Sequence, residues 1–279
     1  MATSIFSGLA RDTSLSRRFA RTPDRAAQNG QVLFHSTFEN GFDGWRDHYN
    51  YKTPYPPIGL TSYPVMSGGH ALQLSTVDGP ITTTGGFTSG ATFKNLARYY
   101  DTGLVSFSGY FAHGSGRGAN AWDQWGLSLD TQKWDSSSRA FYKVWCQDRT
   151  STTTPAWYLR GATATDNIVI PFSSTSTSGE NENKFNFDYV RLTVDFSANG
   201  GLGGYYELQV NKDVFDLRTI FAGTPAEPPQ TGGATENDRN YSSFGGGMNP
   251  GLFINPNARL QSNYPAILVA DELMMTVQD

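Results

Sequence analysis

One predicted β-hairpin, residues 187–212, constrains the fold more than any other part of the sequence. Apolar residues alternate with polar ones along 187–196 and again along 205–212, which is the period of a strand with one buried face. The connection between them holds four glycines, which accept positive φ without strain. The expected buried positions are Val190, Leu192, Val194, Phe196, Tyr206, Leu208 and Val210. A hairpin with one apolar face needs a second layer against it, so we predict a β-sandwich.

Other segments repeat this short alternating pattern, and the clearest are 31–39, 65–74, 104–111, 125–129, 141–146, 156–160, 167–172 and 266–277. Glycine is frequent, with 30 residues, and 14% of the chain is aromatic, a composition typical of many short strands joined by turns. We expect roughly ten to twelve strands, no long helix and no internal repeat. The fold class predicted is an all-β antiparallel jelly-roll sandwich. The Pro/Gly-rich segments 49–64 and 222–250 are expected to be surface loops.

Residues 1–30 differ in composition from the rest and are predicted to be an arm outside a single domain, 31–279. The arm contains Arg11, Arg17, Arg18, Arg21 and Arg25. Two interpretations stay open: a mobile tail, or an arm that docks on a neighbouring subunit. The arm lacks a basic and apolar secretory signal, so we expect synthesis in the cytoplasm without a signal peptide.

The net charge of −4 gives no electrostatic reason to bind nucleic acid. No apolar run is long enough for a membrane-spanning helix. The single cysteine, Cys146, excludes an internal disulfide and is expected to be buried and inert.

Three motifs resemble those of jelly-roll carbohydrate-binding modules: FENGFDGW at 38–45, SGGHALQL at 67–74 and DELMMTV at 271–277. The hairpin motif YELQVNK at 206–212 is similar to that of concanavalin-A-like lectin and glucanase sandwiches. The resemblance implies a concanavalin-like fold whose first and last strands are neighbours. It also implies a structural calcium held by Glu39 and Asp271, with the chain near Gly69 and His70 completing the shell. The alternative, that the two carboxylates are ordinary strand-end residues, stays open.

Sugar recognition uses flat aromatic rings together with amide and carboxylate groups. The predicted carbohydrate-binding residues are Trp122, Asp123, Gln124 and Trp134, in expected turns, and Tyr205 and Glu207, on the polar face of the hairpin. For any single tryptophan, packing in the core is the competing interpretation.

Strand parity separates two of the other aromatic residues. Trp125 shares a face with Leu127 and is expected in the core. Tyr142 lies on the opposite face from Trp145 and Gln147.

No catalytic motif of the related sandwich enzymes is present. The retaining-glucanase motif E-x-D-x-x-E is absent, and so are the lyase motifs Q-(I/V)-H and Y-F-K-x-G. Asp195 and Glu207 lie on neighbouring strands, but such carboxylate pairs are commonly solvated. No His/Cys cluster has zinc spacing.

We therefore predict a non-catalytic structural or binding protein, a phage or phage-like virion subunit such as a tail or head decoration. It would contact neighbouring subunits through the arm and a cell-surface glycan through the sandwich, and would reach the outside by lysis. The alternative is a polysaccharide lyase or glycoside hydrolase on the same scaffold, and a third hypothesis is a lone carbohydrate-binding module.

Overall fold

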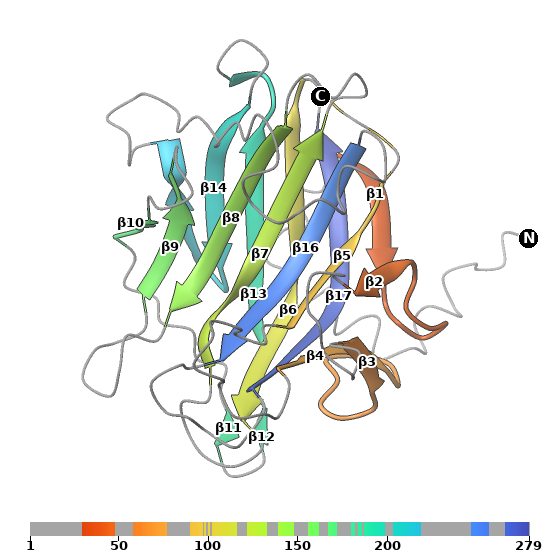
Figure 1. Ribbon diagram of the computed structural model, residues 1–279. Helices are drawn as coiled ribbons and strands as arrows, with labels where there is room; N and C mark the ends of the chain where they lie inside the picture. Colours follow the sequence, from red (N-terminus) through yellow and green to blue (C-terminus); the bar gives the residue numbers. More distant parts are fainter. Residues whose placement is uncertain are drawn as a thin grey trace, which may run out of the picture.

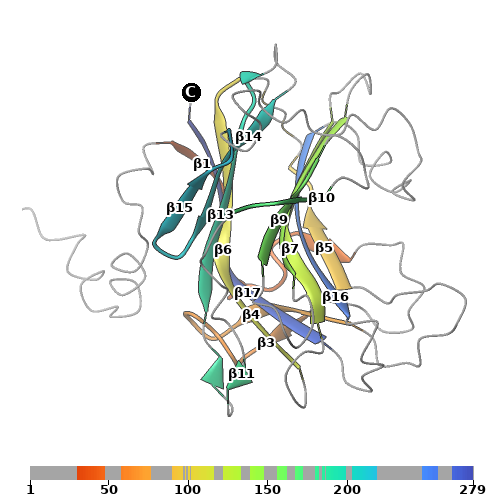
Figure 2. The ribbon, with the colours of Figure 1, turned by 90° about the vertical axis from the view of Figure 1, so that its left-hand side faces the viewer.

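The computed structural model describes most of the predicted sandwich. The described residues are 30–47, 58–76, 90–96, 98, 100, 102–115, 122–132, 139–147, 156–161, 167–171, 180–181, 184–185, 187–198, 203–218, 247–256 and 266–278. They form strands and turns without an α-helix, in two large antiparallel sheets that face each other (Figures 1 and 2). No helix in this part of the chain is long and apolar enough to cross a membrane.

Sheet A has eight strands in the order β15-β14-β13-β6-β17-β4-β3, with β1 also paired to β17. Its strands are β1 (Gln31–Ser36), β3 (Ile58–Thr61), β4 (Ala71–Ser75), β6 (Leu104–Ser115), β13 (Asp188–Asp195), β14 (Gly204–Val210), β15 (Asp213–Asp216) and β17 (Ala266–Gln278). The predicted hairpin is β13 and β14, and the first strand lies beside the last, as the resemblance implied.

Sheet B has seven strands in the order β10-β9-β8-β7-β16-β5-β2 and lies at the front in Figure 1. Its strands are β2 (Trp45–Asp47), β5 (Gly90–Lys94), β7 (Trp122–Gln132), β8 (Arg139–Gln147), β9 (Ala156–Arg160), β10 (Asn167–Val169) and β16 (Gly247–Pro256). A separate short pair joins β11 (Glu180–Asn181) to β12 (Lys184–Phe185).

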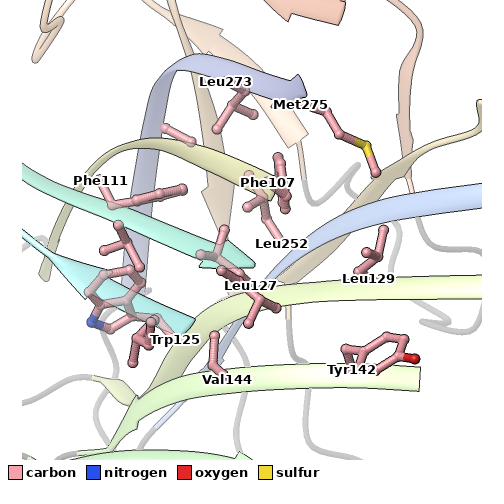
Figure 3. Close-up of a cluster of buried hydrophobic side chains, with 14 of the residues drawn as sticks. Phe107, Phe111, Trp125, Leu127, Leu129, Tyr142, Val144, Leu252, Leu273 and Met275 are labelled. Carbon is pink, nitrogen blue, oxygen red and sulfur yellow. The ribbon is translucent and has the colours of Figure 1, made fainter. Parts of the chain in front are cut away.

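The core lies between the two sheets. Phe107 and Phe111 from sheet A and Trp125 and Leu252 from sheet B are at most 1% exposed, and Figure 3 shows them turned toward the space between the layers. Trp125 packs edge-on against Trp157, with ring centroids 5.5 Å apart. The expectation of an inward Trp125 is confirmed. Burial of these apolar rings is the main stabilising contribution in such a sandwich.

Two predicted loops contain strands. Residues 222–250 were expected to be a surface loop, but β16 begins at Gly247 and pairs with β7 and β5 inside sheet B. Residues 49–64 were expected to be irregular, but 58–61 form β3. In both cases glycine and proline obscured a strand whose pairing is supplied by distant residues.

Candidate functional site

The outer face of sheet B, meaning the side turned away from sheet A, carries side chains in ordered rows. Antiparallel pairing sets one residue of each strand level with one of the next, so side chains in register form rows across the strands. Three rows cross β8, β7 and β16, and each has its own chemical character. Figure 1 views the molecule from the side of this sheet.

The first row, called the aromatic row, contains Tyr158, Trp145, Gly126, Phe253 and Ala91, which are paired in that order. Trp145 and Tyr158 are stacked, with ring centroids 5.8 Å apart and an interplanar angle of 14°. Trp145, Tyr158 and Phe253 form a buried cluster separate from the main core. These rings lie on the outer side of sheet B, so they do not contribute to the core between the two sheets.

Gly126 is required in the middle of this row. A Cβ atom there would lie 2.1 Å from the carbonyl oxygen of Val144 and 2.8 Å from the Cβ of Trp145. A side chain would therefore collide with the neighbouring strand and with Trp145. Glycine allows Trp145 to lie close against β7.

The second row, called the cation row, contains Lys143, Ser128, Gly251, Phe93 and Arg46 in register. The Lys143 ammonium lies 3.9 Å from the ring centroid of Phe253 and 5.5 Å from that of Trp145. These contacts tie the cation row to the aromatic row by attraction between the ammonium and the ring faces.

Arg160 adds a further cation beside Lys143. It follows Leu159, which pairs with Val144, so the register of β9 brings Arg160 level with Lys143. Its guanidinium lies 5.4 Å from the ring centroid of Phe141.

Amide side chains lie on the opposite side of the aromatic row from the cation row. Gln147 is level with Gln124, and Asn255 donates to the Oε1 atom of Gln124 at 3.2 Å. These three residues, called the amide row, are partly exposed. A second polar group lies beyond the cation row, where Asn95 donates to the Oδ1 atom of Asn249 at 2.6 Å.

Carboxylates are scarce on this face. Among the outer-face residues of sheet B whose side chains the structure describes, Asp130 is the one carboxylate, and it is 2% exposed. Glycoside hydrolysis commonly requires two carboxyl groups on either side of the scissile bond. The described part of this face therefore supplies binding groups and lacks that pair.

The structure separates the residues predicted to bind carbohydrate. Gln124 was expected in a turn but lies within strand β7, in the amide row. Trp122 and Asp123 were expected in a turn but begin strand β7, and their side chains are outside the described part. Trp134 lies outside the described residues. Glu207 lies on the outer face of sheet A, where it forms an ion pair with Arg191 at 2.5 Å.

The expected outward orientation of Tyr205 is wrong. Its side chain is 1% exposed and packs between the sheets against Tyr142, with centroids 5.3 Å apart. A β-bulge pairs Thr193 with Glu207 but Val194 with Tyr205, which leaves Tyr206 as the extra residue and turns Tyr205 inward. The hydroxyl of Tyr205 accepts from the Lys143 N–H at 2.8 Å and donates to its carbonyl. Burial raises the pKa of Tyr205 above its usual range.

The residues predicted to bind calcium meet at one turn, residues 66–70. Asp271 Oδ2 accepts from the Met66 and Ser67 N–H groups, and Glu39 Oε1 accepts from those of Gly69 and His70. Burial raises the pKa of Asp271 to about 7. Within the described ranges, no three His, Cys, Asp or Glu residues gather closely enough to hold a metal ion. In this arrangement the two carboxylates hold the turn by hydrogen bonds to its N–H groups.

The calcium role therefore stays a prediction with a direct test. If calcium binds, a chelator should lower the melting temperature, because the ion stabilises only the folded chain. Asp271→Ala should then remove the chelator effect. A melting temperature that is the same with calcium and with chelator would leave the hydrogen bonds as the sole account of this turn.

Sequence reasoning missed most of the outer-face residues for identifiable reasons. The parity of β8 correctly separated Tyr142 from Trp145 and Gln147, and the structure places Tyr142 in the core and Trp145 on the outer face. The same alternation along β9 separates Tyr158 from Trp157 and could have predicted that Tyr158 lies on the outer face. Phe253 could not be found, because β16 was not recognised as a strand.

This architecture is similar to that of several solved protein structures. No family model matches the chain, and a search of curated proteins also gave no match. Among solved structures, an endo-1,3-β-glucanase from Streptomyces sioyaensis is similar with a TM-score of 0.50 and 11% identity, over 90% of this chain and 98% of that one. An endo-β-1,4-glucuronan lyase from the fungus Trichoderma reesei follows at a TM-score of 0.49 and 10% identity, over 84% and 94%. The carbohydrate recognition domain of Emp47p has a TM-score of 0.44 and 9% identity, over 86% and 97%.

The strand order and pairing define an all-β antiparallel sandwich of two sheets. This is the concanavalin-A-like lectin/glucanase fold, as the sequence motifs implied. Identities this low establish the fold and leave the function to the residues of the site.

Proposed function

We propose that this protein binds a polysaccharide without cleaving it, and that the outer face of sheet B is the binding surface. The observation that carries the proposal is the amide row, in which the partly exposed Gln124, Gln147 and Asn255 lie level with one another across three strands. Amides donate to and accept from sugar hydroxyls. The rings of the neighbouring aromatic row are at most 8% exposed, so they support the strands that carry the amides and are not themselves the contact surface. The fold is shared with the endo-1,3-β-glucanase from Streptomyces sioyaensis, so this scaffold is compatible with a polysaccharide ligand.

The non-catalytic part of the proposal is supported by the charges of the face. Asp130 is the one carboxylate among its described side chains, and no described histidine lies there. A lyase or glycoside hydrolase on this scaffold remains the alternative, and it predicts product release.

The predicted setting, a subunit of a phage or phage-like virion, belongs to the same proposal. It rests on the composition of the arm, of which residues 1–29 lie outside the described part.

The amide row provides the cleanest test of binding. Gln147→Ala and Asn255→Ala each remove hydrogen-bonding groups from partly exposed side chains, so the fold should remain intact. We expect each to weaken polysaccharide binding about fivefold to tenfold, since one hydrogen bond contributes about 1 kcal/mol. Titration calorimetry against a panel of soluble polysaccharides measures this effect.

Gln73→Ala is the matched control, because Gln73 is a partly exposed glutamine on β4 of the other sheet. It should bind like the unchanged protein. Assays for new reducing ends and for unsaturated sugar ends should stay at background with every polysaccharide that binds. Steady product release would overturn the non-catalytic proposal, and unaltered binding by both amide variants would move the site off this face.

A further inference from the structure

We propose that the ligand of the amide row is a neutral polysaccharide with an extended backbone, which lies across the strands of sheet B with one sugar unit per strand. This inference rests on the proposed function and specifies its ligand class. The juxtaposition that carries it is a row of four uncharged, partly exposed residues on four neighbouring strands. They are Ala156 on β9, Gln147 on β8, Gln124 on β7 and Asn255 on β16.

The amides of this row have polar atoms available to a ligand. Asn255 donates from its Nδ2 atom to Gln124 Oε1 at 3.2 Å, which leaves Asn255 Oδ1 as an acceptor and the Gln124 Nε2 group as a donor. Gln147 has no side-chain hydrogen bond to another residue in the described ranges. All three side chains are partly exposed, so a ligand reaches them without displacing the strands.

The chemistry of these residues matches hydroxyl groups. An amide both donates and accepts, and so does a sugar hydroxyl, so the two exchange hydrogen bonds in either direction. A carboxylate only accepts, and the residue best matched to it is arginine, whose two parallel N–H groups are charged. The four residues of the row carry no charge. The row therefore favours hydroxyl-bearing sugar units over uronate units.

The spacing of the row matches an extended chain. Neighbouring strands in a sheet are about 4.8 Å apart, so the row of four residues spans about 14 Å across sheet B. One pyranose unit of an extended β-1,4-linked chain is about as long as one strand spacing. Such a chain keeps one unit level with each residue of the row. A chain that coils, such as a β-1,3-linked or an α-1,4-linked glucan, turns away from a straight row.

The aromatic row gives the amides a rigid support. Trp145, Tyr158 and Phe253 lie two residues along the same strands from Gln147, Ala156 and Asn255, and they form a buried cluster against which Ala156 packs. Packing of these rings fixes the strands at the amide positions. Binding on a surface that is already ordered costs less conformational entropy than binding on a mobile one.

The inference is tested first with soluble oligosaccharides of defined length. Cello-, manno- and xylo-oligosaccharides of two to six units are extended neutral chains, laminarihexaose and maltohexaose are coiled neutral chains, and hexagalacturonate is acidic. We expect one extended series to gain about fivefold to tenfold in affinity from two to three units, where a third amide is reached, and at most about twofold per unit beyond four. Its hexamer should bind about tenfold more tightly than the coiled and acidic hexamers.

Salt gives an independent measurement on the same complex. Raising sodium chloride from about 50 mM to about 500 mM should leave the affinity of the extended hexamer unchanged, because hydrogen bonds between neutral groups are not screened. A marked loss of affinity in high salt would contradict a neutral contact.

Variants then locate the chain on the row. Gln124→Ala removes the central amide and should weaken binding of every chain of three or more units about fivefold to tenfold. Ala156→Gln adds a fourth amide level with Gln147, and should strengthen binding of the tetrasaccharide about fivefold while changing the trisaccharide by at most about twofold. Gln73→Ala, on the other sheet, is the control and should bind every chain like the unchanged protein.

The outcomes separate this inference from the proposed function. Tighter binding of a coiled or acidic hexamer than of every extended chain would overturn the ligand class and leave polysaccharide binding in place. An extended chain whose affinity is unaltered by Gln124→Ala would not lie on the row. If no oligosaccharide bound while a polysaccharide in the calorimetric panel did, this inference alone would fail. If neither bound, both proposals would fail.

Discussion

Replacing Trp125 by alanine is expected to lower the free energy of unfolding by about 3–5 kcal/mol. Trp125 is 0% exposed in the core, on the same side as Phe111 in Figure 3. Its ring centroid lies 5.5–5.7 Å from those of Phe111, His113 and Trp157. Alanine would leave a cavity lined by these rings, and rigid strands on both sides prevent it from closing. Domains are commonly stable by about 5–15 kcal/mol, so the loss is a large share of the total. Urea unfolding followed by circular dichroism measures the change.

Val214→Ala is the matched comparison. Val214 is 54% exposed on the edge strand β15, and its truncation should change the unfolding free energy by at most about 0.5 kcal/mol. A Trp125→Ala protein with the urea midpoint of the unchanged protein would contradict the two-sheet core, because Trp125 is fully buried in that core.

Strand parity explains why the core could be predicted from sequence. Val190, Leu192 and Val194 alternate along β13 without interruption, and all three are buried as expected. Trp125 and Leu127 follow the same rule in β7. Where a strand is regular, the sequence alone decides which face each residue occupies.

A bulge breaks this rule in β14. Tyr206 was expected to be buried and Tyr205 exposed, but Tyr205 is the buried residue. The sequence shows no mark of the extra residue, because a bulge depends on how two strands pair and not on the residues of one. For this reason Tyr205, which was predicted to bind carbohydrate, lies in the core and not at the candidate site.

Strand β16 was not predicted, because its composition argues against a strand in the middle of a sheet. Pro250 lacks an N–H group and pairs with Leu129 in β7. The N–H of Met248 points to the other neighbour, where it donates to Leu96, and N–H directions alternate along a strand. Pro250 is two residues from Met248, so it turns its missing donor to the same side, opposite Lys94 at the end of β5. One ladder bond between β16 and β5 is therefore absent, while the pairs on both sides of it are kept. Phe253 and Asn249 reach the site because this strand tolerates its proline.

His113→Phe is expected to make the protein more stable in acid relative to the unchanged chain. Burial lowers the pKa of His113 from 6.5 to about 4, while the nearby Asp188 raises it in part. Between these two pH values the unfolded chain binds more protons than the folded one, so His113 lowers stability as the pH falls. Phenylalanine keeps a ring beside Trp125 and cannot be protonated. The stability difference between variant and unchanged protein should shift in the variant's favour by on the order of 2 kcal/mol from pH 7.5 to pH 4.5.

The comparison of two proteins is essential, because Asp271 titrates with the opposite sign. Its folded pKa of about 7 lies above its unfolded value, so its burial makes the fold more stable as the pH falls through 7. Asp271 is present in both proteins and cancels in the difference between them. Hydrogen bonds lost with the imidazole lower stability equally at both pH values and cancel in the same way. Urea unfolding of both proteins at pH 7.5 and 4.5 gives the four free energies required, and a difference that does not change with pH would show that His113 is reached by solvent protons in the folded state.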